Sequence, residues 1–235
     1  MNRPRSDPNL AQLLAAAEKL KPLLDQIAFV GGCVAGILIT DPGAAPARAT
    51  LDVDVIVEAA SYVKFTALEQ RLRQLGFRES RAEGAPICRW VNGDLLLDFM
   101  PVDPAILGFS NRWYGPALAT SHRVLIGAHE IRIITAPYFL ATKLEAFRGR
   151  GKGEFRTSHD LEDIVTVVDG RPELVGEVHL AAADLRNYLS DEFKDLLSNR
   201  DFLEALPGHL LPDTTSQQRL GLVLERMKQL VLIGT

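Results

Sequence analysis

The segment LDVDVIV at residues 51–57 decides the fold. In its first half, apolar residues and aspartates alternate with a period of two, which is typical of a strand. Asp52 and Asp54 are therefore expected on one face of this strand. Upstream, the apolar run at residues 27–30 stops at Gly31-Gly32. This pattern predicts a second strand that ends in a glycine turn.

Hydrophobic periodicity predicts the elements around these two strands. Helices are expected over residues 9–24, 34–39 and 62–75, the first of them opened by Asp7 or Asn9. An Asn-Gly-Asp turn at residues 92–94 predicts a hairpin of residues 87–91 and 95–99. Residues 101–122 look irregular, and residues 123–134 predict another pair of strands.

From residue 137 onward the pattern is helical almost to the end of the chain. The predicted helices cover residues 137–147, 158–168, 172–189, 191–206 and 215–231. The order of elements predicts an α+β fold, in which a mixed β-sheet with flanking helices is followed by a helical C-terminal part. We therefore expect a core with an N-terminal helix at residues 1–135 and a helical domain at residues 136–235.

The composition limits the function classes that fit the chain. With 235 residues, of which 47% are hydrophobic and 24% charged, the chain can bury a full core. It has no apolar run of about 20 residues, and its two cysteines are too few for a disulfide framework. Residues 1–7 carry basic side chains that no apolar stretch follows, so no signal peptide is expected. These features predict a cytoplasmic protein without a membrane partner. The net charge of −4 gives no global attraction to nucleic acid, although a local basic groove remains compatible with it.

Three aspartates form the candidate catalytic centre. Asp52 and Asp54 would project side by side from their strand, and Asp98 lies inside the apolar run LLLDFM at residues 95–100, where a charge needs a partner or a metal. Carboxylate oxygens are the ligands that Mg²⁺ prefers, and two such ions can activate a hydroxyl and stabilise a leaving pyrophosphate. Gly31 and Gly32 would let backbone N–H groups approach a triphosphate, ahead of a helix N-terminus that favours anions. An Asp-x-Asp pair alone is equally compatible with two solvated side chains at a strand end.

The motifs resemble a known superfamily. The stretch FVGG at residues 29–32, followed by RATLDVDV at residues 48–55, resembles the signature of the polymerase β-like nucleotidyltransferases. Within that superfamily it is most similar to AbiEii-type nucleotidyltransferases, the toxin components of type IV toxin–antitoxin systems. KLEA at residues 143–146 and HDLEDI at residues 159–164 follow the pattern of that group. The resemblance covers roughly residues 25–170 and implies a nucleotidyltransferase fold.

The resemblance implies a role for each matching residue. Asp52, Asp54 and Asp98 would bind metal, two Mg²⁺ ions in all, and Asp98 would also help to deprotonate the acceptor. The implied nucleotide contacts are Gly31, Gly32, Arg48, Thr50, Lys143, Asp160 and Asp163. Two positions depart from the pattern: Cys33 replaces the usual Ser or Thr, and TSHD at residues 157–160 replaces an Arg-x-Lys-Asp lead-in.

Several of these residues have a plainer interpretation. Lys143 could be a solvated helix lysine, and Arg48 could be a surface loop residue. The loop from Arg148 to Arg156, which also carries Arg150 and Lys152, could be a solvated connector or a basic arm for a polynucleotide. Ser158 is expected to cap a helix that has His159 and Asp160 in its first turn. The NRWY cluster at residues 111–114 would cap the core or stack on a base.

The expected activity is transfer of a nucleotidyl group from an NTP to an acceptor hydroxyl. The resemblance suggests RNA, such as tRNA, as the acceptor and a cognate antitoxin as a protein partner. Two alternatives remain: an enzyme of the same fold that modifies a protein or small molecule, and a catalytically silent nucleotide-binding module.

Overall fold

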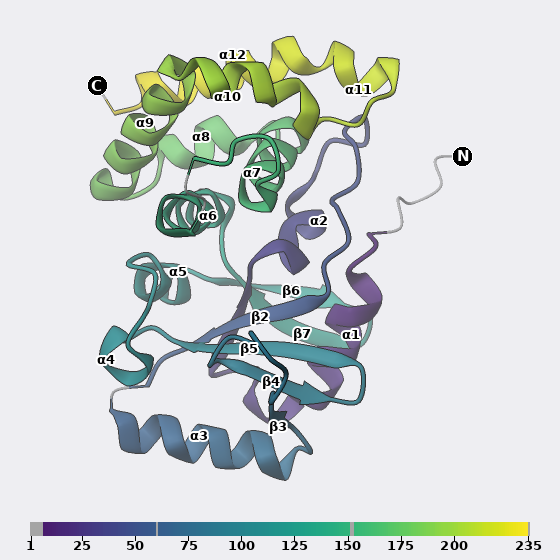
Figure 1. The fold of residues 1–235 in the computed structure, drawn as a ribbon, viewed down its shortest axis with the longest axis vertical. Coiled ribbons are helices and arrows are strands. Elements are labelled where there is room, and N and C mark those ends of the chain that lie inside the picture. Colours follow the sequence, from purple (N-terminus) through teal and green to yellow (C-terminus); the bar gives the residue numbers. More distant parts are fainter. Residues whose placement is uncertain (1–6, 60, 151–152, 235) are drawn as a thin grey trace. The chain divides into compact units, whose positions relative to one another are not determined.

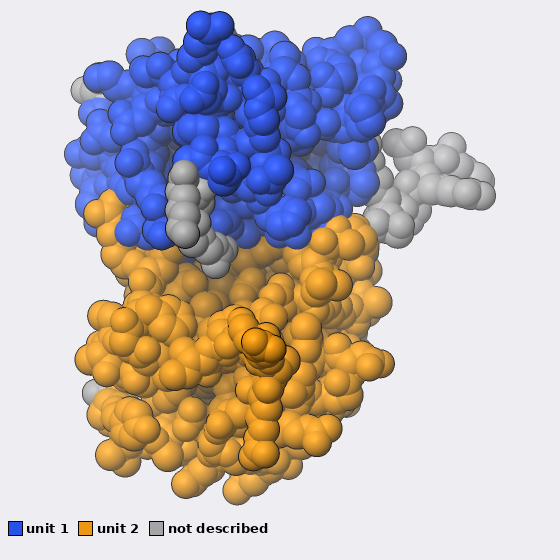
Figure 2. Space-filling view, viewed as in Figure 1, with its two compact units in different colours: residues 1–7, 35–48, 136–235 blue, residues 8–34, 49–135 orange. Residues whose placement is uncertain are grey.

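The structure is a computed structural model that describes residues 7–59, 61–150 and 153–234. The chain forms two compact units, which Figure 2 shows in different colours. The sheet unit holds residues 8–34 and 49–135, and the helical unit holds residues 35–48 together with the residues from 136 onward. The expected linear division at residue 135 did not include this exchange of residues 35–48.

The sheet unit is built on one seven-stranded mixed sheet with the strand order β3-β4-β5-β2-β1-β7-β6 (Figure 1). Strands β1 and β2 are antiparallel, whereas β2 and β5 are parallel. A parallel pair needs a crossover connection, and the chain between β2 and β5 contains a helix that supplies it. The strands are β1 (Ile27–Val30), β2 (Asp52–Val57), β3 (Arg78–Glu79), β4 (Arg89–Asn92), β5 (Leu95–Pro101), β6 (His122–Ile126) and β7 (His129–Ile133).

One face of this sheet is covered by α1 (Leu10–Lys19) and α3 (Tyr62–Gln74). Phe65 of α3 stacks on Phe99 of β5, with the ring centroids 5.9 Å apart, and Lys19 of α1 donates to Asn92 over 2.9 Å. Phe99 follows Asp98 directly, and side chains alternate along a strand. Asp98 therefore points to the opposite face, which leaves that face available for a polar site. The remaining helical segments of this unit are η1 (Lys21–Leu23), η2 (Gly32–Val34), α4 (Pro104–Leu107) and α5 (Tyr114–Ala119).

The helical unit packs α6 (Ala136–Arg150) on α7 (His159–Gly170), and α12 (Leu220–Leu232) packs on both α7 and α9 (Ala183–Ser198). Its core contains fully buried side chains such as Phe139, Ile164 and Phe193. The other segments are α2 (Ala35–Leu38), α8 (Leu174–His179), α10 (Arg200–Ala205), η3 (Leu206–His209) and α11 (Thr214–Gln218).

Residues 35–48 join the helical unit through a charged junction. Arg219 donates to Asp169 over 2.7 Å and to Asp41 over 2.6 Å, and the backbone N–H groups of Thr40 and Asp41 donate to Gly170 over 2.9 Å. The carboxyl of Asp41 has a lowered pKa, chiefly because Arg219 donates a hydrogen bond to it. The contacts of Thr40 and Asp41 join chain positions more than 120 residues apart, so periodicity could not reveal them.

The predicted fold class is confirmed: a mixed sheet with flanking helices is followed by helices. The strand at residues 27–30, the helix near 62–75 and both hairpins are also confirmed. None of the helices among the described residues is both long enough and apolar enough to cross a membrane.

Several secondary-structure predictions were wrong in detail. The helix predicted over residues 191–206 is the end of α9 followed by α10, and the one predicted over residues 215–231 is divided into α11 and α12. Residues 101–122 are not wholly irregular, since they contain α4 and α5. The helix predicted over residues 172–189 is interrupted between α8 and α9, where Arg186 donates to the carbonyl of Ala181 over 2.7 Å. The first helix ends at Lys19, and a 3-10 turn follows it. Hydrophobic periodicity locates helices but does not determine where they end or break.

Candidate functional site

The three predicted acids lie together on the sheet. Asp52 and Asp54 share one face of β2, and Asp54 pairs in register with Asp98 on the neighbouring parallel strand β5. Adjacent strands are about 4.8 Å apart, so the carboxylates of Asp54 and Asp98 are close neighbours. Asp98 is buried, whereas Asp52 and Asp54 are half-buried.

The glycine turn after β1 lies directly against this acid cluster. Gly31 has a φ of +70°, and a Cβ atom placed on it would lie 1.9 Å from Oδ2 of Asp54. The strand register explains the contact, because Val30, the last residue of β1, pairs with Asp54. Glycine is therefore required at position 31 both for its backbone conformation and for the space that the Asp54 carboxylate occupies.

Replacing Gly31 with alanine is expected to destabilise the protein more than the same change at Gly93. Both glycines have a positive φ, but a Cβ on Gly93 would meet nothing within 4 Å. Gly93→Ala should therefore cost only the backbone strain, about 1–2 kcal/mol of unfolding free energy. Gly31→Ala should cost about 1–3 kcal/mol beyond that, because the Asp54 carboxylate must move. Chemical denaturation of the two variants would measure the difference, and equal losses would contradict the close approach.

Arg89 holds two of the three acids and was missed by the sequence analysis. Its Nε and Nη2 atoms each donate to Asp98 over 2.8 Å, and Nη2 also contacts Asp52. The pKa of Arg89 is raised above its usual value, mainly by the hydrogen bond to Asp98 and against the effect of burial. The hairpin prediction carried the signal for this residue, because the hairpin register places Arg89 opposite Asp98.

The acid cluster also affects the neighbouring thiol of Cys88. Burial raises the pKa of Cys88 to about 12, and the negative charges of Asp98 and Asp54 add to that effect. The thiol therefore stays protonated at neutral pH. Cys33, which departs from the family pattern, is buried, and its Sγ lies 3.0 Å from the carbonyl oxygen of Val30. This placement agrees with the interpretation of Cys33 as a small packing residue.

The donor chemistry of the cluster fits a divalent cation with one condition. Carboxylate oxygens of Asp52, Asp54 and Asp98 suit Mg²⁺, but both oxygens of Asp98 accept from Arg89. Across residues 7–59, 61–150 and 153–234, no group of three or more His, Cys, Asp or Glu side chains is arranged to hold a metal ion. A cation shared by all three acids therefore requires Arg89 to release Asp98.

Two other predicted contact residues border the cluster. Thr50 precedes β2, its hydroxyl donates to the carbonyl of Asp52 over 3.1 Å, and its N–H donates to Asn9 over 2.9 Å. Asn9 is buried and occupies the N-cap position of α1 without a side-chain capping bond. Its side chain instead fixes the chain just before the acids, a role that the sequence analysis did not foresee. Gly32 is buried in η2.

The other four predicted contact residues form a second cluster inside the helical unit. Lys143 of α6 lies 3.1 Å from Asp160 and 2.7 Å from Asp163, both on α7, and Arg48 donates to Asp163 over 2.9 and 3.1 Å. Lys143, Asp160 and Asp163 are buried. The plain interpretation of Lys143 as a solvated lysine is therefore wrong, whereas Arg48 is a half-buried loop residue that is paired with Asp163. Asp160 and Asp163 are one helical turn apart, as expected.

The remaining motifs have structural roles. Ser158 caps α7 by accepting from the N–H of Leu161 over 3.3 Å, as predicted. Asn111 and Trp113 are buried, which favours core capping over base stacking. In the predicted basic loop, Arg148 lies 2.5 Å from Glu192 and 2.8 Å from Asp195. Lys152 and the side chain of Arg150 lie outside the described residues.

Comparison with solved structures places the fold. An antigenic nucleotidyltransferase-like protein from Paracoccidioides brasiliensis matches with a TM-score of 0.54 and 20% sequence identity, over 86% of this chain and 94% of that one. The JHP933 protein from Helicobacter pylori matches with a TM-score of 0.45 and 17% identity, over 97% and 91% of the two chains. No protein-family model and no curated protein sequence matches the chain. On the first of these likenesses, the fold is nucleotidyltransferase-like.

Proposed function

We propose that the chain is a metal-dependent nucleotidyltransferase that moves an NMP group from an NTP to an acceptor hydroxyl. The observation that carries this proposal is the grouping of Asp52, Asp54 and Asp98 on one sheet face, with Gly31 packed against Asp54, in a nucleotidyltransferase-like fold. Structural acids would rarely be placed in register on adjacent strands, because opposed like charges destabilise a sheet.

In the proposed reaction, the acceptor oxygen forms a bond to the α-phosphorus, and the bond from that phosphorus to the pyrophosphate oxygen breaks. Asp52, Asp54 and Asp98 would hold Mg²⁺, two ions in all, which neutralises the phosphates. Asp98 can take up the acceptor proton only after Arg89 frees one of its oxygens. The backbone at Gly31 and Gly32, together with Thr50, would position the nucleotide beside these acids.

The nucleotide contacts expected of Arg48, Lys143, Asp160 and Asp163 remain predictions. These four residues bind one another within the helical unit, so Lys143 can reach a triphosphate only by exchanging a carboxylate for a phosphate. That exchange is chemically reasonable, because both are oxyanions that accept from an ammonium group.

The direct test is to incubate the purified protein with each α-³²P-labelled NTP, Mg²⁺ and total cellular RNA. An Asp52→Ala/Asp54→Ala variant serves as the control. Label in RNA with the wild type alone would support the transferase and identify its base and acceptor class. Label in protein would instead support an enzyme of the same fold with a protein acceptor, and no label with any NTP would contradict the proposal.

A more specific form of this proposal is a toxin similar to the AbiEii type. In that case the acceptor is RNA, and a cognate antitoxin binds the protein. This role predicts that expression slows growth and that Asp54→Ala relieves the effect. If expression of neither the wild type nor the Asp54→Ala variant changes growth, the toxin role is contradicted, whereas the proposed transferase chemistry is not.

Arg89 favours a second candidate function, a silent nucleotide-binding module. A guanidinium that permanently neutralises Asp98 and Asp52 would leave no complete metal site. The two candidates differ in whether the divalent cation and Arg89 compete for the same carboxylates.

Replacing Arg89 with glutamine is expected to strengthen Mn²⁺ binding by the protein alone about tenfold or more, because the carboxylates lose a competing cation. The metal-free variant should be less stable than the wild type by about 1–3 kcal/mol, since a charge-assisted pair is lost. Mn²⁺ should recover the lost stability, because it binds the folded protein and not the unfolded chain. Calorimetric titration with Mn²⁺ and denaturation with and without it would measure both effects. Mn²⁺ binding by the Arg89→Gln variant with none by the wild type would favour the silent module. Equal Mn²⁺ affinity of the two proteins would show that Arg89 and the cation do not compete for these carboxylates.

A further inference from the structure

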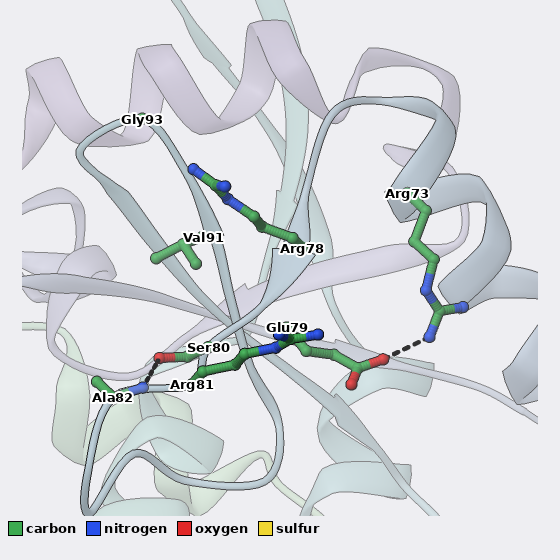
Figure 3. Close-up of a pocket in the computed structure, with 8 residues that line it drawn as sticks. All are labelled: Arg73, Arg78, Glu79, Ser80, Arg81, Ala82, Val91 and Gly93. Atoms are coloured by element: carbon green, nitrogen blue, oxygen red, sulfur yellow. Dashed lines mark hydrogen bonds and ion pairs between the residues drawn. The ribbon is translucent and has the colours of Figure 1, made fainter.

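A basic pocket lies at the β3 edge of the sheet, within the sheet unit (Figure 3). Its volume is about 740 Å³, and its lining includes three arginines, Arg73, Arg78 and Arg81, and one carboxylate, Glu79. The rest of the lining is small or polar apart from Val91. The excess of guanidinium groups over carboxylates favours an anionic ligand.

Two of the three arginines are free to bind such an anion. Arg73 already has two partners, because it pairs with Glu79 and its guanidinium lies 5.1 Å from the ring centroid of Trp90. Arg78 and Arg81 are exposed, and neither forms an ion pair with any residue that the structure describes. Clustered guanidinium groups without carboxylate partners repel one another, so an anionic ligand would stabilise them.

Arg78 and Val91 of the pocket lie on the same sheet face as the acid cluster, whereas Glu79 lies on the opposite face, so the pocket extends around the β3 edge. Arg78 pairs with Val91, Val91 pairs with Leu96, and Leu96 pairs with Asp52. Cross-strand partners point to the same face, so this row leads from Arg78 to Asp52 over three strand spacings, about 14 Å. The next row links Arg89, Asp98 and Asp54 in the same way.

We propose that the Arg78–Arg81 pocket binds the phosphodiester backbone of a single-stranded nucleic acid acceptor whose terminal hydroxyl reaches the acid cluster. A stacked strand carries about one phosphate per 3.4 Å, so some four phosphates span the row from Asp52 to Arg78. The net charge of −4 makes this local basic site, and not a general field, the element that recruits the strand. The inference rests on the proposed function, because the acid cluster is taken as the reacting centre.

The test compares Arg78→Glu/Arg81→Glu with Lys64→Glu/Arg71→Glu. The control residues are exposed on α3 and do not line the pocket, and both variants change the net charge equally. Binding of a fluorescein-labelled 12-nucleotide RNA is measured by anisotropy at 50 and 200 mM salt. The pocket variant should bind at least about tenfold more weakly with a salt slope lower by about two, and the control should stay within about twofold.

Competition and nucleotide binding complete the experiment. Excess inorganic phosphate should displace the RNA only weakly, and polyglutamate at equal charge should displace it less than unlabelled RNA does. Equal displacement by polyglutamate and by unlabelled RNA would point to an acidic peptide as the ligand. Equal RNA binding by the two variants would contradict the assignment of the pocket as the RNA-binding site. Mg²⁺–ATP binding should be the same in all three proteins. Pocket-dependent RNA binding without any transfer would contradict the proposed function alone, whereas transfer to RNA that the pocket variant retains in full would contradict this inference alone.

Discussion

Replacing Asp54 with asparagine is expected to lower nucleotidyl transfer at least about 10³-fold, because it removes a metal-binding charge that contributes several kcal/mol to the transition state. The free energy of unfolding should stay unchanged or rise. Asp54 faces Asp98 in register, so loss of one charge relieves like-charge repulsion across the two strands. Loss of activity without loss of stability is the signature of a residue retained for function.

The matched control is Asp94→Asn, which makes the same chemical change at an exposed position in the β4–β5 turn. Its transfer rate and unfolding free energy should both equal those of the wild type. Initial rates with labelled NTP and urea denaturation of both variants give the two numbers. An Asp54→Asn protein that keeps full activity would remove Asp54 from the proposed catalytic centre. One that unfolds much more easily than the wild type would mark Asp54 as a structural residue.

The acid cluster could be predicted from the sequence because it depends on local rules. Asp52 and Asp54 are two residues apart in a strand, so alternation alone places them on one face. The apolar neighbours of Asp98 marked it as a buried charge that needs a partner. The glycine pair directly after an apolar run likewise indicated the turn, although its close approach to Asp54 emerged only from the strand register.

The partners of these residues were missed, because they depend on which segments pair and in which register. Arg89 was expected only to lie in a hairpin strand, although the register of that hairpin places it opposite Asp98. Arg48 and Asp163 are 115 residues apart in sequence, and no periodicity links them. The basic pocket depends on β3, a two-residue strand too short to give an alternating pattern.

Whether the glycine pair precedes an anion-binding helix N-terminus depends on the length of the helix that follows it. The segment that follows Gly31 forms a 3-10 turn and then the four-residue helix α2. Few aligned peptide dipoles accumulate over one turn, so the structure offers little helix dipole there. The glycine pair is explained better by its fit against the Asp54 carboxylate, which makes Gly31 part of the geometry of the acid cluster.

The stability of Asp163 variants distinguishes a structural role of the cluster of Arg48, Lys143, Asp160 and Asp163 from a nucleotide-binding role. Replacing Asp163 with alanine is expected to lower the unfolding free energy by about 3–5 kcal/mol, because it leaves buried cationic groups undercompensated. Asp163 contacts both Lys143 and Arg48, and its side chain is only 2% exposed. Glu162→Ala is the control on the same helix: its side chain is 36% exposed and lies 3.9 Å from Arg48, so the change should cost less than about 1 kcal/mol.

A compensating change tests the cause of the Asp163→Ala loss. Lys143→Met combined with Asp163→Leu replaces the ion pair with apolar side chains of similar size and should recover part of the stability. Recovery stays partial because Asp160 loses its contact with Lys143 and Arg48 loses its contact with Asp163. Urea denaturation of the four proteins measures these differences, and Mg²⁺–ATP binding is measured beside it. If Asp163→Ala keeps the wild-type stability but binds Mg²⁺–ATP at least about tenfold more weakly, the cluster contacts nucleotide directly. A large loss of stability that the double change partly restores, with Mg²⁺–ATP affinity unchanged, would assign Lys143 and Asp163 to the core of the helical unit and remove them from the nucleotide site.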